Sequence, residues 1–151
     1  MLKNLDPLLT PELLGVLAAM GHGDELVLCD ANFPADSLAR TTTHGRPIRL
    51  AGANAPQATS AILSLLPLDS FVETPAMRMA VGDDPDALPD VHQEVQEAID
   101  AAAGRRLPLG ALERFAFYER ARSAYAIVAT GERRFWGCFV FAKGVIPPEG
   151  A

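Results

Sequence analysis

The sequence has little positive charge. Lys and Arg together number 13 against 19 Asp and Glu, which gives a net charge of −6. A duplex nucleic-acid binder needs cationic side chains to displace counterions, and an anionic membrane surface also attracts positive charge. No apolar run approaches the roughly 20 residues that span a bilayer. Asp6, Pro7 and Pro11 interrupt the first apolar residues, unlike a signal peptide. We therefore expect neither nucleic acid nor membrane as a partner.

Metal ligands and cofactor motifs are also scarce. The two cysteines, Cys29 and Cys138, each lie in an apolar run, and the three histidines are scattered, which makes a poor zinc site. The chain has no G-x-G-x-x-G after a strand, no phosphate-binding G-x-x-x-x-G-K-[ST] and no G-x-S-x-G elbow. We expect no metal, no nucleotide cofactor and no serine hydrolase chemistry. Buried free thiols are typical of a reducing cytoplasm.

What is present fits one globular domain over residues 1–151, with 49% hydrophobic and 21% charged residues. Apolar periodicity predicts helices over 11–20, 56–66 and 91–103. Their predicted N-terminal caps are Thr10, Asn54 and an Asp90/Gln93 capping box, respectively. Gly21 is predicted to end the first helix and Gly104 the third. Apolar runs predict strands over 26–29, 48–50, 77–81, 125–129 and 135–141, and a short strand leading into a helical turn near 113–124. Strands separated by helices predict a three-layer α/β/α fold with a mixed, mainly parallel sheet.

Two polar residues flank the first predicted strand. His22 lies between two glycines just before it, and imidazole titrates near neutrality, which suits proton transfer. Asp30 follows the strand, at the edge where such sheets gather ligands, and an ionised carboxylate can accept two sugar hydroxyls. A histidine that bonds a carbonyl in a turn and an aspartate that caps a loop are the alternatives.

Other candidates are weaker. Asp69 in the LDSF segment fits a turn or a cap as well as a binding site. Tyr118 could exchange a phenolic proton and Arg114 could hold a hydroxyl, while Phe115 and Phe117 beside them are expected to pack in the core. The paired arginines at 105–106 and 133–134 could form an RNA face, but a solvated surface or a subunit contact suits this acidic chain better.

Several blocks, in the correct order over nearly the whole chain, resemble the fucose mutarotase and ribose pyranase family. They are residues 1–3 (MLK), 8–14 (LLTPELL), 20–25 (MGHGDE), 30–35 (DANFPA), 68–71 (LDSF), 114–121 (RFAFYERA), 126–128 (AIV), 130–132 (TGE) and 143–145 (KGV). The RFAFYERA block resembles the fucose branch. The resemblance implies that His22 is the proton donor, that Tyr118 is a second acid or base, and that Asp30, Asp69 and Arg114 bind sugar.

The sequence departs from the family near its C-terminus. Family members usually carry a Tyr-Gly-Asn triplet that meets the sugar, and the corresponding residues here are Trp136, Gly137 and Cys138. Trp136 can still stack on a sugar face and donate from its indole nitrogen, but Cys138 is a poor substitute for an amide. This departure leaves the proposed catalytic pair unchanged and bears on which sugar is bound.

The resemblance implies an isomerase, a sugar mutarotase like L-fucose mutarotase, that opens and recloses a hemiacetal by general acid/base chemistry without a cofactor. It also implies a ring-shaped homo-oligomer, often a decamer, with the sugar site near a subunit contact. Two alternatives remain: a non-catalytic monosaccharide-binding accessory, suggested by the altered triplet, and a structural ring or RNA-associated protein, suggested by the arginine pairs.

Overall fold

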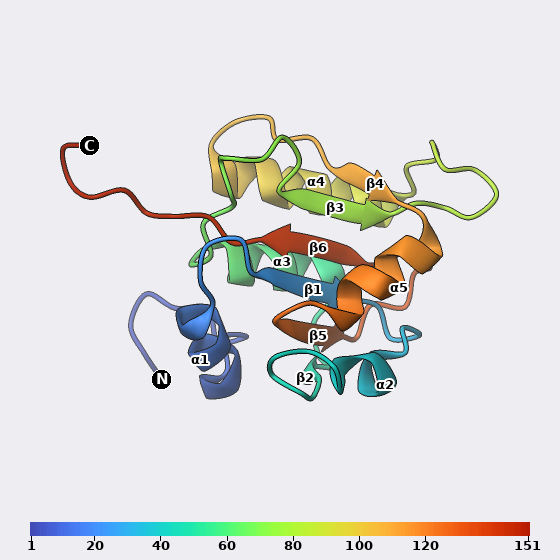
Figure 1. The fold of residues 1–151 in the computed structure, drawn as a ribbon, viewed down its shortest axis with the longest axis horizontal. Coiled ribbons are helices and arrows are strands. Elements are labelled where there is room, and N and C mark those ends of the chain that lie inside the picture. Colours follow the sequence, from blue (N-terminus) through green and yellow to red (C-terminus); the bar gives the residue numbers. More distant parts are fainter.

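A computed structural model describes all residues, 1–151, and contains five helices and six strands (Figure 1). The helices are α1 (Pro11–Ala19), α2 (Ala35–Ala39), α3 (Ala55–Leu63), α4 (Asp90–Ala103) and α5 (Arg114–Arg122). The strands are β1 (Glu25–Cys29), β2 (Ile48–Leu50), β3 (Ala76–Met79), β4 (Gly110–Leu112), β5 (Ala126–Thr130) and β6 (Phe139–Ala142). None of the helices has the length and apolar character needed to cross a membrane.

The six strands form one sheet in the order β2-β5-β1-β6-β3-β4. Strands β2, β5 and β1 are parallel to one another, as are β3 and β4, while β6 is antiparallel to both of its neighbours. Only β6 therefore runs against the others, and the prediction of a mixed, mainly parallel sheet is confirmed. To reach β6 from β5, the chain passes over the carboxyl end of β1 through residues 131–138.

Helices cover both faces of the sheet, which confirms the three layers. Helices α1, α3 and α4 pack in one apolar cluster and α2 and α5 in the other, with α5 in front of the sheet and α3 and α4 behind it in Figure 1. Alternate residues of β1 enter opposite clusters: Leu26 and Leu28 face α3 and α4, and Val27 and Cys29 face α2 and α5. Because both faces of β1 are buried, its sequence is continuously apolar.

Most local signals act as predicted. Thr10 caps α1 through its hydroxyl, which accepts the N–H of Leu13 at 3.2 Å. Asn54 and Gln57 form a reciprocal capping box at the start of α3. Gly104 ends α4 with a φ of 68°, a left-handed conformation that costs glycine little because it has no Cβ.

Two predicted helix ends are wrong. The C-cap residue of helix α1 is Met20, in extended conformation, and not Gly21. The Lys143 ammonium group ends the helix there because it binds the carbonyls of Leu17 and Met20. The predicted capping box on α4 does not form. Pro89 occupies the N-cap position, and the Gln93 amide donates to the Leu88 carbonyl instead.

Three further predictions need correction. Helix α3 ends at Leu63, three residues earlier than expected, and the short helix α2 was not predicted. The last strand begins at Phe139 because residues 135–138 form a loop. Phe115 is 64% exposed, whereas Phe117 is fully buried; on α5 the buried pair is Phe117 and Ala121, four residues apart, and Phe115 lies on the outer side.

Candidate active site

A cavity of about 250 Å³ opens where β1 and β3 end and α5 begins. Its lining includes five of the seven residues predicted from the sequence, and the full set is Asp30, Asn32, Phe33, Met79, Arg114, Tyr118, Phe135, Trp136 and Cys138. Sequence reasoning did not single out Asn32, Phe33, Met79 or Phe135; the DANFP block was the available signal for the first two. The cavity thus combines acidic, phenolic and cationic groups with aromatic walls, a combination suited to a polyhydroxylated ring.

Asp30 is the buried carboxylate of this cavity, with 6% of its surface exposed. It accepts the N–H of Asn32 at 3.0 Å, and its other oxygen lies 3.5 Å from the Cys138 thiol. Burial raises the pKa of Asp30, and hydrogen bonds from Asn32, Cys138, Gly137 and Phe33 partly oppose that rise. Asp30 is therefore a fixed acceptor whose charge is only partly compensated by its neighbours.

Arg114 and Tyr118 lie one turn apart on α5, so their side chains meet on one side of the helix. The Arg114 Nε donates to the Tyr118 hydroxyl at 3.0 Å, and the guanidinium carbon lies 5.4 Å from the centre of the Tyr118 ring. Phe33 packs edge-on against Tyr118 at 5.4 Å. Glu113 caps the helix by accepting the N–H groups of Phe115 and Ala116. The phenol oxygen is thus oriented by a cation at the cavity mouth.

Trp136, Gly137 and Cys138 belong to the loop that crosses the end of β1. Gly137 is required there because a Cβ would lie 2.9 Å from the Glu132 side chain and 3.4 Å from Cβ of Asp30. Burial raises the pKa of the Cys138 thiol well above its usual range, so the thiol stays protonated and can donate to Asp30. The cysteine at position 138 therefore alters the immediate surroundings of the Asp30 carboxylate.

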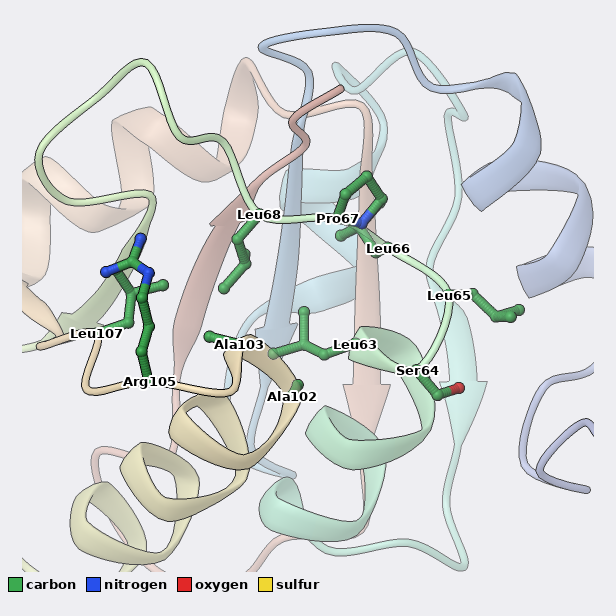
Figure 2. Close-up of a pocket in the computed structure, with 10 residues that line it drawn as sticks. All are labelled: Leu63, Ser64, Leu65, Leu66, Pro67, Leu68, Ala102, Ala103, Arg105 and Leu107. Atoms are coloured by element: carbon green, nitrogen blue, oxygen red, sulfur yellow. The ribbon is translucent and has the colours of Figure 1, made fainter. Parts of the chain in front are cut away.

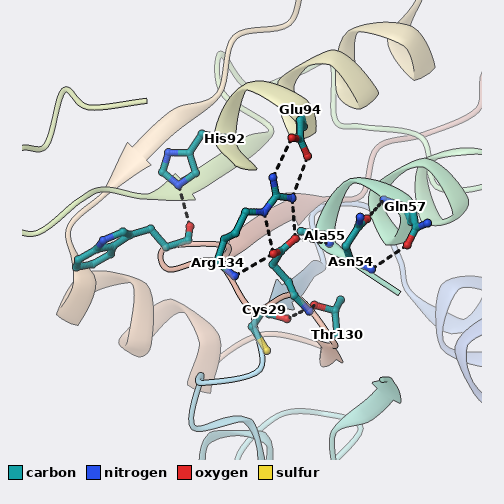
Figure 3. A network of polar contacts seen from close by, with 10 residues as sticks. Cys29, Asn54, Ala55, Gln57, His92, Glu94, Thr130 and Arg134 are labelled. Atoms are coloured by element: carbon teal, nitrogen blue, oxygen red, sulfur yellow. Dashed lines mark hydrogen bonds and ion pairs between the residues drawn. The ribbon is translucent and has the colours of Figure 1, made fainter. Parts of the chain in front are cut away.

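The same loop is held by ion pairs, in which only the Glu132 carboxylate is buried. Glu132 is 3% exposed and binds the Arg134 guanidinium at 2.9 Å, while Arg134 also binds Glu94 of α4 at 2.8 and 2.9 Å (Figure 3). The hydrogen bond from the Arg134 side chain lowers the pKa of Glu132 to about 2, because its effect exceeds the rise that burial causes. The N–H of Ala55 also donates to this carboxylate. Sequence reasoning missed this network because Glu94 lies 40 residues from Arg134.

His22 and Asp69 lie at the other edge of the sheet. The His22 Nε2 is 3.0 Å from Asp69, whose same oxygen accepts the N–H of Phe71 at 3.0 Å. The imidazole is 45% exposed and packs at 5.2 Å against the ring of Phe71. The Phe71 N–H and then His22 lower the pKa of Asp69 despite its burial. A buried carboxylate thus orients an accessible imidazole.

These two groups of residues do not meet within one chain. His22 precedes β1 and Asp30 follows it, and a strand of five residues spans about 16 Å. The structure therefore brings Asp30, Arg114, Tyr118, Trp136 and Cys138 together and leaves His22 with Asp69 at the opposite edge. A sugar in the cavity could reach an imidazole of this kind only on a second copy of the chain.

A second hollow of about 350 Å³ lies between the carboxyl ends of α3 and α4 and the segment that leads to Asp69 (Figure 2). Its lining is mostly apolar, and Arg105 is its only charged residue. It contains no carboxylate or imidazole and therefore offers no acid/base pair. No three His, Cys, Asp or Glu side chains gather in a group that could hold a metal ion.

Residues 3–146 match the RbsD / FucU transport protein family. The chain belongs to this family. The fucose mutarotase of Bos taurus is 46% identical over 152 residues, which cover 98% of this chain and 96% of that protein. The family membership confirms the resemblance carried by the sequence blocks.

Solved structures related to this RbsD / FucU chain share its fold. Protein Atu2016 has 52% identity and a TM-score of 0.95, with 97% of each chain covered. The fucose mutarotase of Streptococcus pneumoniae, solved in complex with L-fucose, has 38% identity and a TM-score of 0.85, with 97% of this chain and 100% of that chain covered. The three-layer fold is therefore common to members that have diverged considerably in sequence.

Proposed function

We propose that this RbsD / FucU protein is a sugar mutarotase, an isomerase that interconverts the α and β anomers of a monosaccharide such as L-fucose. The observation that carries the proposal is the cavity that joins Asp30, from a block that resembles the family, to Arg114 and Tyr118, from the block that resembles its fucose branch. The relationship to the Bos taurus fucose mutarotase and to the Streptococcus pneumoniae protein that binds L-fucose supports the same substrate class.

The reaction needs two proton-transfer groups on opposite sides of a pyranose. A base removes the proton of the anomeric hydroxyl, the bond between C1 and the ring oxygen breaks, and an acid protonates that oxygen. The open aldehyde rotates and recloses on its other face, and both protons return. We assign donation to the ring oxygen to His22 and the partner role to Tyr118, with Asp30, Asp69 and Arg114 orienting groups. General acid/base catalysis of this kind contributes roughly 10²–10⁴-fold and requires no cofactor.

We further propose that each site is completed by His22 of a neighbouring copy. The two groups of residues occupy opposite edges of one sheet, so a head-to-tail contact can join them, and head-to-tail contacts form a ring when the rotation between copies closes. Exposed apolar side chains accompany both edges: Phe71 and Val72 near His22, and Phe115 and Phe135 near the cavity. This supports a ring-shaped homo-oligomer, for which we propose a decamer. The free thiols Cys29 and Cys138 support a cytoplasmic location.

A non-catalytic sugar-binding role is the second candidate, favoured by one observation. Cys138, in place of the amide that the family usually has, directs its thiol toward Asp30 and leaves one fewer strong hydrogen-bonding group for the sugar. Such a protein would bind the monosaccharide without accelerating anomer exchange.

Anomer exchange measured by NMR saturation transfer separates the two candidates. We expect the wild-type protein to accelerate exchange of L-fucose, and His22→Ala and His22→Gln to reduce the rate by about 10²-fold or more. His22→Gln is the sharper variant because an amide can still bond Asp69 but cannot relay a proton near neutrality. Binding without acceleration by the wild-type protein would favour the accessory role, and full activity of His22→Gln would refute the assignment of the donor.

A further inference from the structure

The only tryptophan of the chain lies in the candidate sugar cavity and has an unusual backbone conformation. Trp136 has a φ of 67°, and Asn4 is the only other non-glycine residue with a positive φ. The left-handed region is disfavoured for a residue with a side chain because its Cβ crowds a carbonyl oxygen. Contacts elsewhere must therefore hold Trp136 in place.

The carbonyl oxygen of Trp136 supplies two of these contacts. It accepts the N–H of Cys138 at 2.8 Å. It also lies 2.8 Å from Nε2 of His92, whose hydrogen bond is the dashed line beside His92 in Figure 3. A carbonyl can only accept, so His92 carries its proton on Nε2 and donates. His92 is 1% exposed on α4 and packs edge-on against Phe139 at 5.7 Å, which fixes the direction of its N–H.

Helix α4 reaches the loop a second time through Glu94. His92 and Glu94 both point from α4 toward residues 134–136, the first to the Trp136 carbonyl and the second to the Arg134 guanidinium (Figure 3). The cavity itself lies where β1 and β3 end and α5 begins, and neither His92 nor Glu94 lines it. A helix that lines none of the cavity thus anchors the loop that forms one of its walls.

The tip of the Trp136 indole ring packs against the backbone of Gly82. A Cβ on Gly82 would lie 3.2 Å from the tip of the indole ring, so the ring rests against the backbone after β3 with no side chain between them. Anchored through its carbonyl and supported at its tip, the indole has one defined orientation in the cavity.

We propose that His92 is a positioning residue of the sugar site: its Nε2–H holds the carbonyl of left-handed Trp136 and thereby sets the indole face on which the sugar stacks. That the sugar stacks on this indole face rests on the proposed function, whereas the contact between His92 and the Trp136 carbonyl does not. His92 touches no sugar and takes no part in proton transfer. It acts only through Trp136.

Two matched variants test the role of this hydrogen bond. Gln and Met have similar size and shape, and the Gln amide can donate from nearly the position of Nε2, whereas Met cannot. His92→Met leaves the Trp136 carbonyl bonded to Cys138, so no buried acceptor is orphaned and the fold is retained. Gln93→Met, at the neighbouring exposed position of α4, controls for a methionine on this helix.

Tryptophan fluorescence without sugar reports only Trp136. We expect His92→Met to shift its emission to longer wavelength and to increase its quenching by acrylamide, and His92→Gln and Gln93→Met to match the wild-type protein. In saturation transfer with L-fucose, His92→Met should raise the half-saturating sugar concentration about 2- to 10-fold, the range expected for one hydrogen bond, with a maximal rate within about twofold of wild type. His92→Gln should restore the wild-type value.

The outcomes separate the two claims. Identical fluorescence of His92→Met and His92→Gln would overturn the positioning role whatever the protein's activity. Altered fluorescence with unchanged half-saturation, in an active enzyme, would show that Trp136 does not meet the sugar and would also overturn it. A wild-type protein that accelerates no anomer exchange would refute the proposed function, while the fluorescence comparison would still decide whether His92 positions Trp136.

Discussion

At the scale of single residues, the two site aspartates illustrate opposite uses of burial. Asp30 loses its contact with water and gains few compensating donors, so its pKa is raised. Asp69 accepts the Phe71 N–H and lies beside His22, so its pKa is lowered. A buried carboxylate with few donors lowers stability in its charged form, as the proposed sugar-binding role of Asp30 would require, whereas a carboxylate that orients an imidazole contributes to stability in its charged form.

This contrast predicts opposite effects of removing each charge. A raised pKa in the folded state means that stability is lost as the pH rises through that pKa, so Asp30→Asn should be more stable than wild type at pH 7, by about 2–4 °C in Tm. The difference should vanish below the ordinary pKa of aspartate. Asp69→Asn should show the reverse sign at pH 7 and also converge with wild type in acid. Thermal unfolding followed by circular dichroism at pH 7 and in steps from about pH 4 to about pH 2 measures both, because the lowered pKa of Asp69 moves its convergence below the ordinary aspartate range. A gain for Asp30→Asn that is independent of pH would contradict the assignment.

At the scale of elements, the loop between β5 and β6 contributes more residues to the cavity lining than any helix or strand does. Residues 131–138 cross the end of β1, carry Trp136 and Cys138 into the cavity, and are secured by Glu132, Arg134 and α4. A loop without regular backbone hydrogen bonds needs such side-chain anchors to keep one conformation.

Removing the buried charge of this anchor should loosen the loop. Glu132→Gln keeps an acceptor for the Ala55 N–H but loses the ion pair with Arg134, which is partly exposed and retains Glu94. We expect a loss of about 2 kcal/mol in the free energy of unfolding at pH 7, measured by urea denaturation at matched protein concentration. Because the Glu132 pKa is lowered to about 2, the difference should shrink as the pH falls from about 4.5 toward 2.

Glu97→Gln is the matched control. Glu97 is exposed on α4 close to the loop-binding Glu94, and its replacement should change stability by less than about 0.5 kcal/mol. Equal losses for the two variants, or a loss for Glu132→Gln that persists unchanged at pH 3, would argue against a charge-dependent anchor.

At the scale of the whole molecule, the arrangement of the sheet separates the imidazole from the cavity. Because β1 is parallel to β5 and runs between the two groups, no change of side-chain rotamer can bring His22 to Tyr118 in one chain. The proposed head-to-tail contact would bring the amino edge of one sheet to the carboxyl edge of the next, and so His22 of one copy to Tyr118 of another.

Complementation between two inactive variants tests this arrangement. His22→Ala and Asp30→Ala should each be inactive alone. When the two are co-expressed and mixed oligomers are isolated with two tags, roughly a quarter of the sites should combine an intact imidazole with an intact cavity. Anomer exchange should then recover to about that fraction of wild type. A chain with both changes, co-expressed with His22→Ala, should recover nothing. No recovery in either mixture would mean that the two groups do not act on one sugar.

Much of the fold could be predicted from local signals. The apolar run of β1, the Thr10 and Asn54 caps and Gly104 each act through neighbours within a few residues, so their meaning survives without the tertiary structure. The position of Asp30 at the carboxyl edge followed from the same reasoning. One helix end that was wrong depended on a distant partner, the Lys143 ammonium group at the end of α1, whereas the wrong start of α4 depended on the neighbouring Pro89 and Leu88.

The sequence by itself determined the layers of the fold, the family and the residue types of the site, because periodicity and motif are written along the chain. Only the tertiary structure decided which of those residues meet. Whether Phe115 is buried and which groups hold the left-handed Trp136 depend on contacts between segments tens of residues apart, and those contacts exist only once the sheet has formed.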